Sequence, residues 1–123
     1  MKIRLLLILM TLCTVYPTVL SHQKCKEKPH SMMFRMEEKS IKSKPQPQYT
    51  EEARRHQIIG TVLLRAVFHS SGQIKDVCVV EGLPYGLTRK AVQAAYKIKF
   101  EPVMKDGYPV SVTRYIEYSF SLY

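Results

Sequence analysis

The stretch TVLLRAVFHSSGQIKDVCVV, residues 61–80, decides the fold. Its first half alternates with a period of two, which is the pattern of a strand with one buried face. The residues on that face are Val62, Leu64, Ala66 and Phe68. Residues 70–73 have the composition of a turn, and residues 74–80 are rich in β-branched side chains. We therefore predict an antiparallel β-hairpin.

A helix is expected on each side of this hairpin. Thr50 is a suitable N-cap for the first helix, whose first turn holds two glutamates, and Gly60 is expected to end it. After the hairpin, apolar residues recur at helical spacing, and Thr88 is the expected N-cap. The apolar positions are Leu87, Ala91, Ala94, Ala95 and Ile98.

The C-terminal residues 110–123, VSVTRYIEYSFSLY, alternate over their whole length and predict a long last strand. The element order helix, strand, strand, helix, strand predicts an α+β fold with two helices packed on one face of a three-stranded antiparallel sheet. Between residues 110 and 123 only Arg114 and Glu117 are charged, so the last strand lacks the usual protection of a sheet edge. We infer that this edge accepts an incoming strand, and the alternative is that the chain's own N-terminal part covers it.

Residues 1–21 are expected to be a signal peptide or a short membrane anchor. Two basic residues precede an apolar run, and Val19 and Ser21 have the spacing that signal peptidase reads. The run is shorter than the ~20 residues that span a bilayer, and Pro17 interrupts it. We therefore expect a periplasmic or secreted protein, with an inner-membrane anchored protein facing the periplasm as the alternative. Membrane contact is expected only if this segment is retained.

Residues 22–44 are expected to form a basic flexible linker, and residues 45–123 a single domain. The linker holds much of the positive charge of a chain whose formal net charge is +9. Pro45 and Pro47 favour extended backbone and mark the entrance to the domain. In an exported chain Cys25 and Cys78 can form a disulfide, and two unpaired thiols are the alternative.

The sequence lacks the residue patterns that enzymes and metal sites need. It has no nucleophile-elbow motif, no recognisable catalytic triad and no glycine-rich phosphate loop. The four histidines are scattered, and no cysteine pair has the spacing of metal ligands. Basic residues are not interleaved with aromatic ones along one face. We therefore expect no enzyme activity, no metal, no cofactor and no nucleic-acid binding.

Several short motifs, in this order, resemble the TonB C-terminal domain family. They are Gln46-Pro-Gln-Tyr49, Ala53, Gly60-Thr-Val62, Gly72, Val77 with Val79, and Ala95-Tyr-Lys-Ile-Lys-Phe-Glu-Pro102. The resemblance covers about residues 45–123 and implies the same α+β fold. It also implies that the domain binds outer-membrane TonB-dependent transporters, whose N-terminal peptide, the TonB box, adds as a strand beside the last strand of the sheet.

The resemblance also assigns the partner-binding residues. They are Gln46, Pro47, Gln48, Tyr49, Val112, Thr113, Arg114, Tyr115, Ile116, Glu117, Tyr118, Ser119 and Phe120. Main-chain pairing is expected to provide affinity, with neighbouring side chains tuning which peptide fits. The implied role is energy-dependent transmembrane transport. The expected partner is such a transporter or another strand-donating protein. The alternative is a stand-alone secreted or periplasmic structural or assembly module that forms a homodimer through the same edge, without energy transduction.

Overall fold

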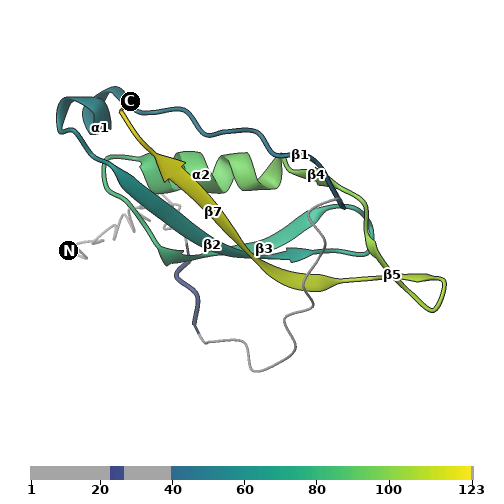
Figure 1. The fold of residues 1–123 in the computed structure, drawn as a ribbon. Coiled ribbons are helices and arrows are strands. Elements are labelled where there is room, and N and C mark those ends of the chain that lie inside the picture. Colours follow the sequence, from purple (N-terminus) through teal and green to yellow (C-terminus); the bar gives the residue numbers. More distant parts are fainter. Residues whose placement is uncertain (1–22, 27–39, 123) are drawn as a thin grey trace, which may run out of the picture.

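The computed structural model describes residues 23–26 and 40–122 (Figure 1). Its elements are β1 (Ile41–Ser43), α1 (Glu51–Arg55), β2 (Gly60–Phe68), β3 (Ile74–Glu81), α2 (Leu87–Tyr96), β4 (Lys99–Phe100), β5 (Val103–Lys105), β6 (Tyr108–Val110) and β7 (Val112–Phe120). The expected signal peptide or anchor, and residues 22 and 27–39 of the expected linker, lie outside the described residues.

The central sheet has three strands in the order β3-β2-β7, and both pairings are antiparallel. The β2–β7 pairing is continuous from Gly60 opposite Phe120 to Phe68 opposite Val112, whereas the β2–β3 pairing is interrupted by two shifts of register. Helix α2 lies across one face of this sheet, and the short α1 lies beyond one end of α2 (Figure 1). The predicted α+β class and the predicted hairpin are confirmed.

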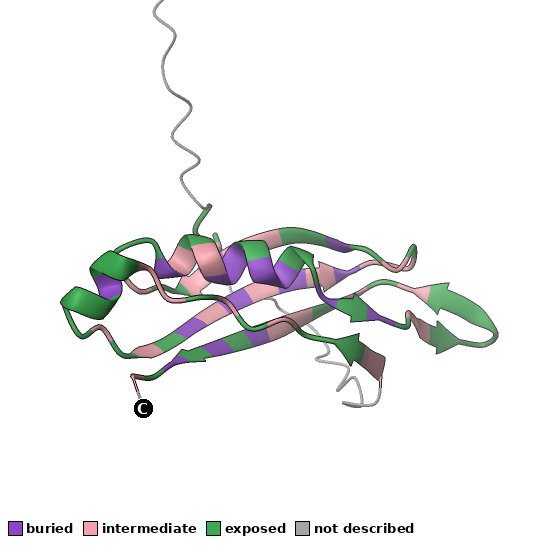
Figure 2. Ribbon diagram, turned by 90° about the horizontal axis from the view of Figure 1, so that it is seen from above, coloured by how far each residue is buried: buried purple, intermediate pink, exposed green. Residues whose placement is uncertain are grey.

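The hydrophobic core lies between α2 and the sheet face that the alternating pattern predicts. The alternate residues of β2 and β7 are buried, and so is one side of α2 (Figure 2). From the strands the core takes Val62, Leu64, Ala66, Phe68, Ile116, Tyr118 and Phe120, and from α2 it takes Leu87, Ala91, Val92, Ala94 and Ala95. Full burial of each large apolar side chain contributes about 1.5–3 kcal/mol, so this layer provides most of the driving force for folding.

The first helix is shorter than expected. Thr50 is its N-cap as predicted, because its side-chain oxygen accepts a hydrogen bond from the Ala53 amide at 3.2 Å. The helix ends at Arg55 and does not continue to Gly60. Gln57 has φ of 51°, a left-handed conformation that an α-helix cannot include, and Gly60 already belongs to β2. The prediction that Gly60 ends the helix is therefore wrong.

The N-cap of α2 also differs from the prediction. Gly86 occupies that position with φ of 81°, which favours glycine, and no side chain caps the helix. Thr88 is the second residue of the helix and stabilises the preceding loop instead. Its Oγ1 accepts a hydrogen bond from the Leu83 amide at 2.9 Å and donates one to the Leu83 carbonyl at 2.8 Å.

The last strand is shorter than the predicted range 110–123, since it runs from Val112 to Phe120 and Val110 belongs to another strand. Residues 108–110 form β6, which pairs with β5 in a separate hairpin, and β7 begins only at Val112. The break falls at Ser111, whose Oγ accepts a hydrogen bond from the Ser70 amide at 2.9 Å. The β5–β6 hairpin extends away from the helix-covered part of the domain (Figures 1 and 2).

Two parts of the expected linker pair with the domain. Strand β1 pairs with β4, and Lys42 forms an exposed ion pair with Glu101 at 2.8 Å. The hydrogen bond and the charge of Lys42 lower the pKa of the Glu101 carboxyl. Residues 23–26 lie beside β3, where Lys24 bridges to Val79. Isolated polar strands of this kind have no hydrophobic pattern, so composition alone favours a linker at these positions.

Tyr118 offers a test of the core. Its side chain is fully buried, and its hydroxyl has no hydrogen-bond partner among the described residues. Burial raises the pKa of the phenol from 10.0 to about 12, so the folded chain holds this proton more tightly than the unfolded chain. Stability is therefore lost as the pH rises from 10 to about 12, by about 2–3 kcal/mol from this group.

We predict that Tyr118→Phe leaves the free energy of unfolding at pH 7 unchanged or raises it by about 1 kcal/mol, because the variant removes an unpaired buried hydroxyl. Its stability should also fall less between pH 10 and 12 than that of the wild type. Urea unfolding at a series of pH values measures both effects. A variant destabilised by several kcal/mol at pH 7 would show that the hydroxyl has a partner.

Candidate partner-binding edge

Strand β7 is an edge of the central sheet, since it pairs with β2 on one side and the described residues provide no strand on the other. Which backbone groups of β7 point outward can be derived from the hydrogen bonds of β3, at the opposite edge of the sheet. Val79 uses both its amide and its carbonyl to bond to residues 23 and 25, so these groups point away from β2. In an antiparallel ladder hydrogen-bonded and non-hydrogen-bonded pairs alternate. Leu64, opposite Val79, therefore points its backbone groups at β7, where its partner is Ile116.

The even-numbered residues of β7 consequently bond to β2, and the odd-numbered ones point outward. The outward set is Thr113, Tyr115, Glu117 and Ser119. One contact supports this assignment independently, because the Nζ of Lys44 donates a hydrogen bond to the Glu117 carbonyl at 2.9 Å. The edge thus presents a regular row of amides and carbonyls in the spacing that an added strand needs.

The predicted contact residues of β7 differ in what they expose. The side chains of Ile116, Tyr118 and Phe120 are 3%, 0% and 4% exposed, so they belong to the core. Thr113, Glu117 and Ser119 are exposed, and Val112, Arg114 and Tyr115 are half-buried. The guanidinium of Arg114 lies 5.8 Å from the centre of the Phe68 ring. The fully exposed side chains along this edge are therefore polar.

The second predicted contact segment, residues 46–49, reaches β7 through Tyr49. The ring of Tyr49 packs edge-on against Phe120, with 5.4 Å between the ring centres. Its hydroxyl donates a hydrogen bond to the Ile58 carbonyl at 2.7 Å, which ties residues 45–49, here called the entrance segment, to the turn after α1. Tyr49 therefore has a packing role in this domain.

Residues 46–48 lie beside α2. Together with Pro45 they form one wall of a groove of about 220 Å³, and the other wall is formed by α2 residues Lys90, Gln93, Ala94 and Lys97. Gln46 and Gln48 are exposed, and Pro47 is half-buried. The structure thus places the predicted residues at two surfaces, the edge on β7 and a groove on α2 that contains Lys90 and Lys97.

Lys44 is a residue at the edge that the sequence prediction missed. Besides its bond to the Glu117 carbonyl, its ammonium group lies 4.9 Å from the centre of the Tyr118 ring. The Lys44 ammonium therefore binds one of the outward-facing carbonyls of β7. In the sequence Lys44 is one of many lysines in a basic segment, so only its position directly before Pro45 distinguished it.

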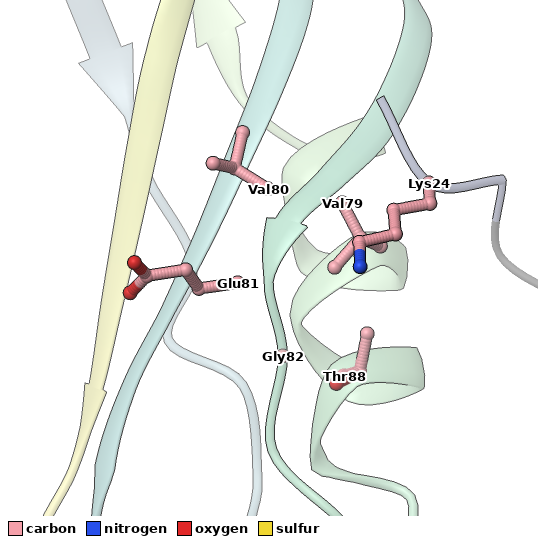
Figure 3. A pocket seen from close by; sticks show the side chains of 6 residues that line it. All are labelled: Lys24, Val79, Val80, Glu81, Gly82 and Thr88. Carbon is pink, nitrogen blue, oxygen red and sulfur yellow. The ribbon is translucent and has the colours of Figure 1, made fainter. Parts of the chain in front are cut away.

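The opposite edge of the sheet also has a cavity beside it. A cleft of about 550 Å³ is lined by Lys24, Val79, Val80, Glu81, Gly82 and Thr88 (Figure 3). The segment that carries Lys24 is joined to β3 by a disulfide between Cys25 and Cys78, the two cysteines singled out in the sequence. In the described parts of the chain, histidine, cysteine, aspartate and glutamate nowhere gather in a group of three that could hold a metal ion. None of the described helices has the length and apolar character needed to cross a membrane.

Fold and edge together define a small α+β domain with one exposed strand of an antiparallel sheet. Residues 45–122 match the family described as the Gram-negative bacterial TonB protein C-terminal. Since the match covers more than half of the chain, the chain belongs to the TonB C-terminal domain family. The resemblance of its motifs to this family is confirmed. TonB C-terminal domains are protein-interaction modules and not enzymes, in agreement with the expectation from the sequence.

Solved structures that are similar to this chain include two TonB proteins. The solution NMR structure of the Pseudomonas aeruginosa TonB C-terminal domain has 28% sequence identity and a TM-score of 0.56, with 67% of this chain and 84% of that chain covered. The TonB2 protein of Vibrio anguillarum has 22% identity and a TM-score of 0.46, with 81% and 98% covered. Comparison with curated proteins finds no match.

Tyr49 allows its hydroxyl and its ring to be tested separately. Tyr49→Phe loses only the bond to the Ile58 carbonyl, so we predict a loss of about 1 kcal/mol in the free energy of unfolding. Tyr49→Ala also removes the ring from Phe120, and we predict a loss of about 3 kcal/mol. Denaturant unfolding of both variants measures the difference. Equal stability of the alanine variant and the wild type would show that the ring does not pack as described.

Proposed function

We propose that this domain binds an extended peptide of an outer-membrane transporter, of the TonB-box type, by adding it as a strand to β7. The observation that carries the proposal is the row of outward backbone groups from Thr113 to Ser119 on an edge without a described neighbouring strand. Family membership supports the kind of partner. Similarity to the Pseudomonas aeruginosa TonB domain supports the fold that presents the edge.

The energetics of the edge suit a reversible complex. Each backbone hydrogen bond contributes about 0.5–1.5 kcal/mol net, so pairing along four outward residues gives modest affinity. The side chains beside the edge are small or polar and add specificity more than apolar burial. An incoming strand also has to displace the Lys44 ammonium from the Glu117 carbonyl. Binding through main-chain pairing is therefore tolerant of peptide sequence and easily reversed.

The proposed setting is the periplasmic side of the cell envelope, where the domain contributes to transport across the outer membrane. In this proposal residues 1–21 direct export or anchor the chain, and residues 45–123 form the binding domain. Gln46 and Gln48 serve as side-chain contacts at the entrance, and the α2 groove with Lys90 and Lys97 favours an acidic segment of the partner.

A proline at Ser119 tests the edge directly. The Ser119 amide points outward, so Ser119→Pro removes a donor that the partner needs without breaking the ladder with β2. The matched control is Ser119→Ala, which loses the same hydroxyl contact with Thr61 but keeps the amide. We predict that the proline variant binds a synthetic TonB-box peptide at least tenfold more weakly than the wild type, whereas the alanine variant binds within about twofold.

Isothermal titration calorimetry measures the affinities, and thermal unfolding checks that the proline variant remains folded. Equal affinity of the two variants would contradict strand addition at β7. If sedimentation instead shows that the wild type forms a dimer that Ser119→Pro dissociates, and the peptide does not bind, the edge serves homodimer assembly and the transporter proposal fails.

A further inference from the structure

The edge of the sheet on the β3 side is occupied by the chain's own residues 23–26, here called the edge strap. Lys24 pairs with Val79 in the parallel direction. The Cys25 amide donates to the Val79 carbonyl at 3.0 Å, and the Val79 amide donates to the Gln23 carbonyl at 3.1 Å. The strap thus satisfies both outward backbone groups of Val79. A disulfide between Cys25 and Cys78 joins it covalently to the strand that it covers.

The non-covalent contacts of the strap are few. Within the described residues, two backbone hydrogen bonds join it to β3. Three of its four side chains, Gln23, Lys24 and Lys26, are exposed, so little apolar surface is buried. Ordering four residues costs more conformational free energy than two hydrogen bonds return. The covalent bond is therefore what keeps the strap on the edge.

We propose that the Cys25–Cys78 bond is a redox switch that controls the β3 edge. In the oxidised chain the strap occupies the edge, and in the reduced chain it leaves. Reduction then exposes the amide and the carbonyl of Val79 and converts a sheet with one open edge into a sheet with two. This switch is independent of peptide binding at β7, which lies on the other side of β2.

The reaction is thiol–disulfide exchange with a dithiol reductant. A thiolate of the reductant attacks Sγ of Cys25, a new sulfur–sulfur bond forms, and Cys78 leaves as a thiolate. The second thiolate of the reductant then attacks the reductant sulfur that is bonded to Cys25. This step closes the reductant's disulfide and releases Cys25 as a thiolate. The chain gains two electrons, and the two cysteine thiolates take up protons from water. The positive charges of Lys24 and Lys26 favour the approach of an anionic thiolate.

Release of the strap also changes the cleft beside β3. Lys24 is the part of its lining that belongs to the strap, while the remaining residues belong to β3, the loop after it and α2 (Figure 3). When the strap leaves, the cleft loses this wall and merges with the open edge. The redox state of the Cys25–Cys78 bond therefore controls the exposure of the Val79 backbone groups and access to the surface around Gly82.

Hydrogen exchange of single amides, measured by NMR on the full chain, tests the switch. The Val79 amide reports on the strap, and the Leu64 and Ile116 amides report on the β2–β7 ladder. We expect reduction with dithiothreitol to speed exchange of the Val79 amide at least tenfold while Leu64 and Ile116 change less than twofold. Cys25→Ser should show the fast exchange without reductant and no further change with it.

A matched control is Lys24→Ala, which changes the strap but keeps the disulfide, and its Val79 amide should exchange as in the oxidised wild type. Slow exchange at Val79 after complete reduction, verified by thiol titration, would overturn the proposal, because the strap would then stay bound without the bond. Equal acceleration at Val79, Leu64 and Ile116 would overturn it as well, since the disulfide would then support the whole fold.

Discussion

The continuous pairing of β2 with β7 is the constraint on which the rest of this domain depends. It joins the strand that follows the first helix to the end of the chain without a shift of register. On one face it brings Leu64 and Ile116 together under α2, and along its outer side it fixes which backbone groups face solvent. A slip of one residue would exchange the buried and exposed faces of β7. The core therefore also determines what a partner strand meets.

Sequence patterns predict those elements of the fold in which buried residues recur at a regular spacing. The alternation of residues 61–68 and the helical spacing after Leu87 identify the buried faces of β2 and α2, because many residues share one environment there. The predicted cap at Thr50 is confirmed for a similar reason, since capping uses a local and recognisable residue order. The motifs from residue 46 to residue 102 identify the family.

Features that depend on one or two residues escape such patterns. The left-handed conformation of Gln57 shortens α1, and a glutamine at that position carries no signal of it. Thr88 has the residue type of a cap but bonds to Leu83, because the loop before α2 folds back towards it. Lys44 and the short strand β1 reach their partners across long stretches of sequence. Such contacts are set by tertiary packing, which local composition does not encode.

The β3 edge of the sheet is covered by residues 23–26, whereas the β7 edge has no described strand beside it. Tyr49 connects the entrance segment to the β7 edge. Its ring rests on Phe120 at the end of β7, and its hydroxyl binds the turn that leads into β2. The same residue thus holds the segment of the predicted glutamine contacts against the strand of the predicted backbone contacts. A change at Tyr49 affects stability and the alignment of both surfaces together.

The disulfide also defines a mechanical path through the molecule. Cys25 and Cys78 are separated by 53 positions in sequence but form one covalent link. A pulling force applied to the chain before Cys25 enters the sheet directly at β3 through this link, so the backbone of β1, α1 and the entrance segment is not in its path. The force then crosses β2 to β7 through antiparallel ladders, whose hydrogen bonds share the load when it acts along the strands. The entrance segment with Tyr49 therefore lies outside the covalent path of such a force.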